Sequence, residues 1–179
     1  MSEASQHQSD RDENGLHDPD ERSEVLDAAP VEAMATTVHE VLATAGKLAG
    51  ERGHAWVSTD DIFAAMLSTD CAASRTLQTL NMSTDGLLER LAFILGRDGG
   101  VAPRNAGEFS PRVERVMQSA RIEAARRKAP AVDTLHLLGA LLRERRGVPS
   151  LLLETPGLGL EPVGAALNRA IREGMTDPS

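Results

Sequence analysis

The residues of this chain that could do chemistry are few, and their spacing does not assemble a catalytic centre. The sequence has five histidines and one cysteine, and no two histidines stand at the i, i+4 spacing with which a helix holds a metal ion. Asp60 and Asp61 are adjacent, so on a helix they point about 100° apart and cannot face each other as a carboxylate pair. Cys71 has no neighbouring base to activate it. We therefore expect no enzyme activity, no metal and no cofactor.

The remaining polar candidates have structural interpretations. Asp60 and Asp61 suit the first turn of a helix, where the helix dipole favours negative charge. Asp61 also follows Ser58 at the S-x-x-D spacing of a capping box. His54 is expected to order the link between two helices. His136 stands among apolar residues, so we expect it to be part-buried with its hydrogen bonds satisfied.

The charge of the chain is concentrated at its N-terminus. The net charge is -8, and residues 1–30 hold nine acidic side chains against two basic ones. So polar a segment cannot bury enough apolar surface to offset chain entropy, and we predict a disordered, solubilising tail, with specific docking as the alternative. The single cysteine and the lack of an apolar leader predict a protein of the reducing cytoplasm. Apolar runs stay well short of the roughly 20 residues that a membrane span needs.

The sequence repeats itself at a constant offset of 75 positions. Ten positions between residues 38 and 77 carry the same residue 75 positions later, and these are Val38, Val41, Ala45, Ala49, Arg52, Val57, Thr59, Ala65, Leu67 and Leu77. The period is longer than the roughly 20 to 50 residues of common solenoid repeats. It indicates a small helical bundle that has been duplicated, and a duplicated bundle offers two related grooves.

Apolar residues recur at helical spacing in both repeats, which predicts an all-α fold of eight helices and no strand. The first repeat spans about 33–97, a Gly- and Pro-rich linker follows at 98–108, and the second repeat spans about 109–174. The predicted helices of the first repeat are about 33–51, 59–68, 72–80 and 84–95. In the second repeat, a helix from 111 has an apolar stripe that runs to Ala124, and helices at about 135–143, 151–153 and 162–173 follow. Ser110 and Pro111 suit the N-cap and first position of the helix that opens the second repeat.

Several short motifs resemble the Clp N-terminal domain. Residues 53–62 (GHAWVSTDDI) and 132–142 (VDTLHLLGALL) are similar to its "GHxxIGTEHLLLGLL" signature, and residues 109–112 (FSPR) are similar to its "FTxRA" start. The resemblance covers about residues 33–173. It implies two four-helix repeats with pseudo-twofold symmetry, in a domain that precedes an ATP-driven unfoldase and receives substrates and adaptors. The sequence has no G-x-x-x-x-G-K-[ST] phosphate loop, so it resembles the receiving domain without its motor.

The same resemblance implies candidate site residues, because some family members bind phosphorylated arginine through the acidic residue of "GTEH" and the Thr of "FTxR". Carried over, these positions are Asp60 with Ala35 in the first repeat. In the second repeat they are Leu135 with Ser110, next to Phe109. A guanidinium needs a carboxylate, which Leu135 lacks, and a phosphate needs a donor, which Ala35 lacks. In this pairing neither site is complete, and helix capping is the alternative role of Asp60 and Ser110.

The resemblance implies a protein-binding module that catalyses nothing, with the groove between the repeats as its binding region. It would act as an adaptor, a substrate receiver or a decoy in Clp-dependent proteolysis. Its partners would be Clp components, adaptors, client polypeptides or a small molecule held in the groove. The alternative is a helical DNA-binding regulator that uses the basic residues from Arg112 to Arg146. No aromatic residues interleave with these arginines, so a solvated face or an acidic partner is favoured over nucleic acid.

Overall fold

The computed structural model describes residues 30–95, 108–144, 147–156 and 159–177. Almost all of the predicted tail and almost all of the predicted linker lie outside these residues. Within them the chain forms eight helices joined by turns and isolated backbone bridges, without a strand, so the all-α prediction is confirmed. The first repeat provides α2 (Thr36–Glu51), α3 (Thr59–Ser68), α4 (Ala72–Thr79) and α5 (Thr84–Leu95). The second provides α6 (Pro111–Arg126), α7 (Thr134–Arg143), α8 (Val148–Leu153) and α9 (Glu161–Arg172).

In each repeat, a serine side chain binds an N–H group in the first turn of a helix that leads to the site, namely Ser58 at α3 and Ser110 at α6. The Asp61 N–H donates to Ser58 Oγ at 3.2 Å, and the Ser58 N–H donates to Asp61 Oδ2 at 2.9 Å, so the predicted capping box of α3 is confirmed. At the start of α6, the Val113 N–H donates to Ser110 Oγ at 3.3 Å. Pro111 occupies the first position of that helix, as the sequence predicts.

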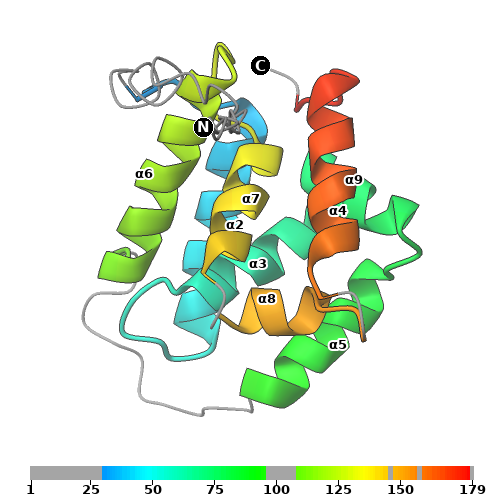
Figure 1. The fold of residues 1–179 in the computed structure, drawn as a ribbon. Coiled ribbons are helices and arrows are strands. Elements are labelled where there is room, and N and C mark those ends of the chain that lie inside the picture. The colour runs from blue at the N-terminus through cyan, green and yellow to red at the C-terminus, as the bar shows by residue number, and fades with distance from the viewer. Residues whose placement is uncertain (1–29, 96–107, 145–146, 157–158, 178–179) are drawn as a thin grey trace, which may run out of the picture.

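The two repeats are arranged around α3 and α7, which contact each other at the centre. In each repeat the first helix lies along the second, α2 along α3 and α6 along α7. The later helices reach across to the other repeat, because α4 packs on α9 and α5 packs on α8. Figure 1 shows α6, α7 and α9 running side by side along one face. Exchanging the repeats exchanges these contacts, which is the pseudo-twofold symmetry that the family resemblance implies.

Two isolated bridges tie the start of each repeat to the other repeat. Met34 pairs with Val132, and Phe109 pairs with Val57, both in parallel orientation. In each bridge the valine N–H donates at 2.8 Å to a carbonyl oxygen of the other repeat. The bridges are equivalent, because Phe109 stands 75 positions after Met34 and Val132 stands 75 positions after Val57. The segment before α2 therefore lies beside α7, and the segment before α6 lies beside α3.

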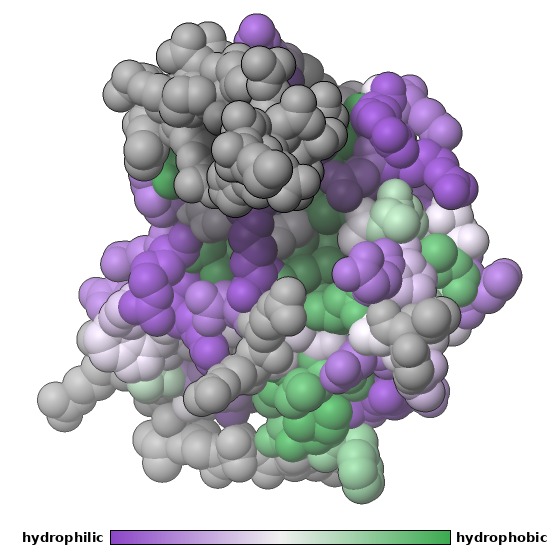
Figure 2. All heavy atoms as spheres, in the orientation of Figure 1, coloured by the Kyte–Doolittle hydropathy of each residue, from purple (hydrophilic) through white to green (hydrophobic). Residues whose placement is uncertain are grey.

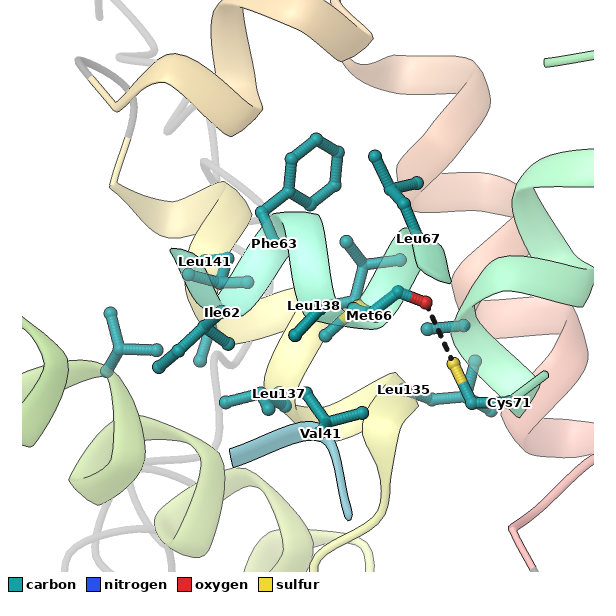
Figure 3. Close-up of a cluster of buried hydrophobic side chains, with 14 of the residues drawn as sticks. Val41, Ile62, Phe63, Met66, Leu67, Cys71, Leu135, Leu137, Leu138 and Leu141 are labelled. Atoms are coloured by element: carbon teal, nitrogen blue, oxygen red, sulfur yellow. Dashed lines mark hydrogen bonds between the residues drawn. The ribbon is translucent and has the colours of Figure 1, made fainter. Parts of the chain in front are cut away.

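The core is aliphatic and centres on α3 and α7. Figure 3 shows apolar side chains of both helices gathered in one cluster, and every side chain labelled there is at most 4% exposed. All residues of α3 from Ile62 to Leu67 are buried, since α2, α5 and α7 cover the helix. Burying one large aliphatic side chain contributes about 1.5–3 kcal/mol. Cys71 is also buried, and its Sγ donates to the Met66 carbonyl at 3.5 Å.

The end of the chain joins both repeats through Asp177, which is 4% exposed. Its carboxylate accepts hydrogen bonds from the N–H of Ala72 and the N–H of Thr134, both at 2.8 Å. Ala72 is the first residue of α4, and Thr134 is the first residue of α7. One side chain thus caps two helices of different repeats and places negative charge at both N-termini.

Candidate functional site

A cavity of about 480 Å³ opens where the start of α3 meets the start of α6. The bridge between Val57 and Phe109 holds these two helix starts together. Trp56, Leu95 and Pro111 contribute apolar walls, and His54, Asp60 and Ser110 contribute polar groups. We call this cavity the Asp60–Ser110 pocket. Its polar groups come from both repeats, so it forms only when the repeats are assembled.

Asp60 provides the carboxylate of the Asp60–Ser110 pocket. Burial raises its pKa above the ordinary value, and the neighbouring Asp61 carboxylate raises it further, although Arg112 partly offsets both effects. Within the described residues, the hydrogen bond to this carboxylate is a long one, from Thr59 Oγ1 at 3.5 Å. A part-buried carboxylate with so little compensation has a strong preference for a cationic ligand that carries N–H donors.

Asp61, by contrast, is engaged by the fold. Its fully buried carboxylate accepts from Arg52 Nη1 at 3.0 Å, from His54 Nδ1 at 2.9 Å and from Ser58 Oγ at 2.7 Å. These bonds fix the loop between α2 and α3, which confirms that His54 orders the link between the two helices. The same bonds hold the first turn of α3 in place and thereby position Asp60 at the pocket.

Ser110 and the N-terminus of α6 provide the anion-binding side of the pocket. Ser110 Oγ accepts the capping bond from Val113, so its hydroxyl hydrogen can still be donated to a ligand. In the first turn of α6, Pro111 has no N–H and the N–H groups of Val113 and Glu114 donate to Ser110, so the Arg112 N–H and the positive end of the helix dipole are what the helix adds. Arg112 follows in the same turn and lies close enough to Asp60 to lower its pKa. A group with negative charge can be stabilised here, within reach of the Asp60 carboxylate.

The other two motif positions, Ala35 and Leu135, are 4% and 0% exposed. The Ala35 N–H donates to the Val132 carbonyl at 2.8 Å, so Ala35 lies beside the start of α7 and not beside Asp60. The pairing within each repeat was therefore wrong. The structure joins Asp60 of the first repeat with Ser110 of the second, because the segments that precede α2 and α6 are exchanged between the repeats.

The crossed arrangement concentrates the useful groups in one place. The Asp60–Ser110 pocket has both a carboxylate and a hydroxyl, whereas the equivalent place has the buried side chains of Ala35 and Leu135. Phe109 is half-buried and serves as the bridge residue beside the pocket. Trp56, 46% exposed, is a wall residue that the motif comparison did not single out. Its rarity was the available signal, because it is the only tryptophan of the sequence.

The prediction for His136 was also wrong in one respect. Its side chain is 2% exposed, and its Nε2 has no hydrogen-bond partner within the described residues. The residue is thus buried but not satisfied. Sequence neighbours could not reveal this, because the groups that would reach Nε2 come from other helices.

Many basic residues of the predicted DNA-binding face are paired with carboxylates. Glu123 accepts hydrogen bonds from Arg127 and Arg143, and Arg112 Nε donates to Glu144 Oε2 at 2.8 Å. Burial alone would raise the pKa of Glu123, but the hydrogen bonds from the two arginines lower it.

Among the described residues, no group of three or more His, Cys, Asp or Glu side chains could hold a metal ion. None of the described helices is both long and apolar enough to cross a membrane.

Comparison with known proteins agrees with the observed fold. The family described as Clp repeat (R) N-terminal domain matches residues 33–155 and 108–178. The chaperone protein ClpB of Oceanobacillus iheyensis is 27% identical over 122 residues, which are 68% of this chain and 15% of that protein. The negative regulator of genetic competence ClpC/MecB of Bacillus subtilis is also 27% identical over 122 residues, with the same coverage. The chain thus spans less than a fifth of these relatives.

Solved structures show the same fold at lower sequence identity. The Hsp104 N-terminal domain from Candida albicans is 15% identical, with a TM-score of 0.69, over 83% of this chain and 97% of that chain. A structure described as a peptide from the EAEC T6SS Sci1 SciI protein is 17% identical, with a TM-score of 0.60, over 78% and 91% of the two chains. The matched residues take in both repeats and the exchanged bridges between them, so we conclude that this chain belongs to the Clp repeat (R) N-terminal domain family.

Proposed function

We propose that this chain is a protein-binding module that recognises client or adaptor polypeptides through the Asp60–Ser110 pocket. The observation that carries the proposal is the meeting of a half-buried carboxylate with a hydroxyl at a helix N-terminus, in a cavity that both repeats build. The relatives it resembles are named as a chaperone and a regulator, and one similar structure is named for a peptide from the EAEC T6SS Sci1 SciI protein. These likenesses support a role in Clp-dependent proteolysis as adaptor, substrate receiver or decoy.

The pocket chemistry favours a side chain with a cation and an anion close together, as in phosphoarginine. The guanidinium would donate to the Asp60 carboxylate, and the phosphate would accept from the Ser110 hydroxyl and the first turn of α6. The Arg112 guanidinium already donates to Glu144, so we assign the phosphate to the Ser110 hydroxyl and to the backbone at the start of α6. The apolar walls exclude water from the ion pair and strengthen it.

Calorimetric titration with phosphoarginine tests this ligand. We expect one site per chain, and we expect Asp60→Asn and Ser110→Ala each to weaken binding by about tenfold or more, since each removes a hydrogen bond to a charged group. Asp70→Asn is the matched control, because the Asp70 side chain is 86% exposed and pairs with Arg75 outside the pocket. Arginine and inorganic phosphate, titrated separately, are expected to bind more weakly than phosphoarginine. Equal binding by wild type and Asp60→Asn would refute the assignment.

The role of the module is tested with a Clp unfoldase, its protease and a phosphoarginine-tagged client. A decoy is expected to slow degradation of the tagged client in proportion to its concentration, and an adaptor is expected to accelerate it. Asp60→Asn is expected to remove either effect. If the wild-type chain and Asp60→Asn change the rate of client degradation equally, the chain acts through another surface.

The DNA-binding alternative gains no support from the paired arginines described above. A gel-shift titration at low salt separates the two functions. We expect no shift at protein concentrations that saturate the phosphoarginine site. Retardation of DNA that falls steeply as salt rises would instead indicate contacts with the phosphate backbone.

A further inference from the structure

Helix α6 carries basic side chains on the side that is turned away from the core. Its buried residues pack towards α7, and its exposed residues include Arg115, Ile122 and Arg126. These three positions are spaced by seven and by four residues, so they lie on one side of the helix. We call this side the outer face of α6, and Arg121 lies along its edge. Figure 1 places α6 at an edge of the molecule, where the atoms drawn in colour in Figure 2 are mainly hydrophilic.

The carboxylates of the described residues do not neutralise the outer face of α6. Arg126 Nη1 lies 3.5 Å from Glu123 Oε2, but the Glu123 carboxylate also binds two further arginines, so three cations share one negative charge. Arg115 has no ion pair within the described part of the chain. The neighbouring Glu114 points about 100° away from Arg115 around the helix. The outer face therefore keeps an excess of positive charge, which a segment rich in carboxylates would neutralise.

The acidic N-terminal segment enters the described structure beside this face. The Val31 N–H donates to the Arg121 carbonyl at 3.4 Å, and Glu32 Oε2 lies 3.7 Å from Arg121 Nε. Residues 18–27, which come shortly before this point, have five acidic side chains against one basic side chain. The pairing of acidic segment and basic helix thus begins within the described residues.

Residues 18–27 are attached close enough to cover the outer face. An extended chain spans about 3.3 Å per residue, so Leu26 can lie up to about 16 Å from Val31. A helix rises about 1.5 Å per residue, so Arg126 is about 8 Å from Arg121 along the axis of α6. The attachment makes docking intramolecular, and short connections give effective concentrations of the order of millimolar. Surface ion pairs that are individually weak can then add up to a populated contact.

We propose that residues 18–27 dock on the outer face of α6. Their carboxylates pair with the arginines of that face, and Val25 and Leu26 cover the exposed Ile122 side chain. The acidic partner of this basic helix is then a segment of the same chain, which keeps other polyanions away from the arginines. No residue of the outer face lines the Asp60–Ser110 pocket, so this inference does not depend on the proposed function.

A spin label in the acidic segment tests the contact in the whole chain. Ser23→Cys provides the attachment site, because Cys71 is fully buried and will not react. At low salt we expect strong paramagnetic broadening of the amide signals of Ile122 and Arg126. The broadening is expected to fall at about 1 M NaCl, where the screening length is about 3 Å.

Two variants of the segment itself give a matched comparison. The first neutralises four acids within residues 18–27, by Asp20→Asn, Glu21→Gln, Glu24→Gln and Asp27→Asn. The second neutralises four acids nearer the N-terminus, by Glu3→Gln, Asp10→Asn, Asp12→Asn and Glu13→Gln. Both variants lose the same charge and leave every described residue unchanged. We expect the first to lose the broadening to the level seen at high salt, and the second to keep it.

A second comparison changes the helix instead of the segment. Arg115→Glu combined with Arg126→Glu is expected to remove the broadening, because like charges then face each other. Arg90→Glu combined with Arg172→Glu makes the same charge change at exposed positions of α5 and α9 and should keep it.

Three results would overturn the proposal. Equal broadening in the two neutralised variants would show that the charges of residues 18–27 do not hold the contact. Broadening that passes in full from spin-labelled chains to isotope-labelled chains in a mixed sample would show that the segment docks on a second copy. Equal binding of heparin, a soluble polyanion, by the two neutralised variants would show that residues 18–27 do not cover the arginines of α6.

Discussion

At the scale of single residues, the adjacent aspartates Asp60 and Asp61 have different roles. Asp61 lies inside a shell of donors from Arg52, His54 and Ser58 and maintains the loop before α3. Asp60 has a pKa raised by burial and by Asp61, despite its place at a helix N-terminus, where the dipole acts in the opposite direction. A raised folded-state pKa means that ionised Asp60 destabilises the fold above that pKa. The destabilisation disappears as pH falls through it.

We therefore predict that Asp60→Asn keeps or raises the melting temperature at pH 7 while it weakens phosphoarginine binding. The gain should shrink as pH falls towards 3.8, the ordinary value for this carboxyl group, because Asp60 is then protonated in wild type too. Thermal denaturation over this pH range measures the effect. Asp61→Asn is the contrast, and we expect it to lose about 3 kcal/mol of stability because buried donors lose their charged partner. Equal losses of stability in Asp60→Asn and Asp61→Asn would contradict the different roles of the two residues.

The same residue scale shows what sequence patterns can predict. The capping box of Ser58 and Asp61 was predictable, because its two members stand three positions apart in one chain segment. The lack of a hydrogen-bond partner for His136 Nε2 was not predictable, since it depends on how the helices pack around the buried ring. Local hydrogen bonds leave a sequence signature, and hydrogen bonds between distant helices leave none.

At the scale of elements, helix ends are controlled by caps, and most of these are local. The predicted start of α6 at Ser110 and Pro111 is confirmed for this reason. The predicted start of α8 near residue 151 is wrong, because the helix begins at Val148 and accommodates Pro149 in its first turn. The cap that Asp177 provides was not predictable, since it lies 105 residues from Ala72 and 43 from Thr134.

Removing this remote cap should destabilise the whole domain. We predict that Asp177→Ala lowers the free energy of unfolding by about 2 kcal/mol, because two buried N–H groups lose a charged acceptor at helix N-termini. Urea denaturation of wild type and variant measures the difference. Asp70→Ala, which removes an exposed carboxylate of a surface ion pair, should change it by less than about 0.5 kcal/mol. A loss confined to one of α4 and α7, seen by amide exchange, would contradict a shared cap.

At the scale of the whole molecule, the repeats are not separable units. The offset of 75 positions predicted a duplication, and equivalent helix contacts confirm it. It could not predict that the segment opening each repeat pairs with the other one, because a single bridge such as Met34 to Val132 has no periodic pattern. This long-range feature decides which candidate residues meet in one place, and it explains why the pairing predicted within each repeat is not the observed one.

Separating the repeats should therefore prevent folding. We predict that residues 30–97 alone are largely unfolded by circular dichroism, since the apolar surface of α3 loses its contact with α7 and Val57 loses its bridge to Phe109. Addition of residues 108–179 is expected to restore helicity and phosphoarginine binding together. Cooperative thermal unfolding of residues 30–97 by themselves would show that the first repeat is an independent unit.

The exchanged bridges also give the domain a direction. Two equal sites related by a twofold axis would let a client dock in either of two opposite orientations. Here one of the two equivalent places has the buried side chains of Ala35 and Leu135. The other place has Asp60 and Ser110, which come from different repeats. The scaffold is thus symmetric in its helices and asymmetric in its pocket, and under the proposed function a polypeptide anchored there by one modified residue would leave the surface in a single direction.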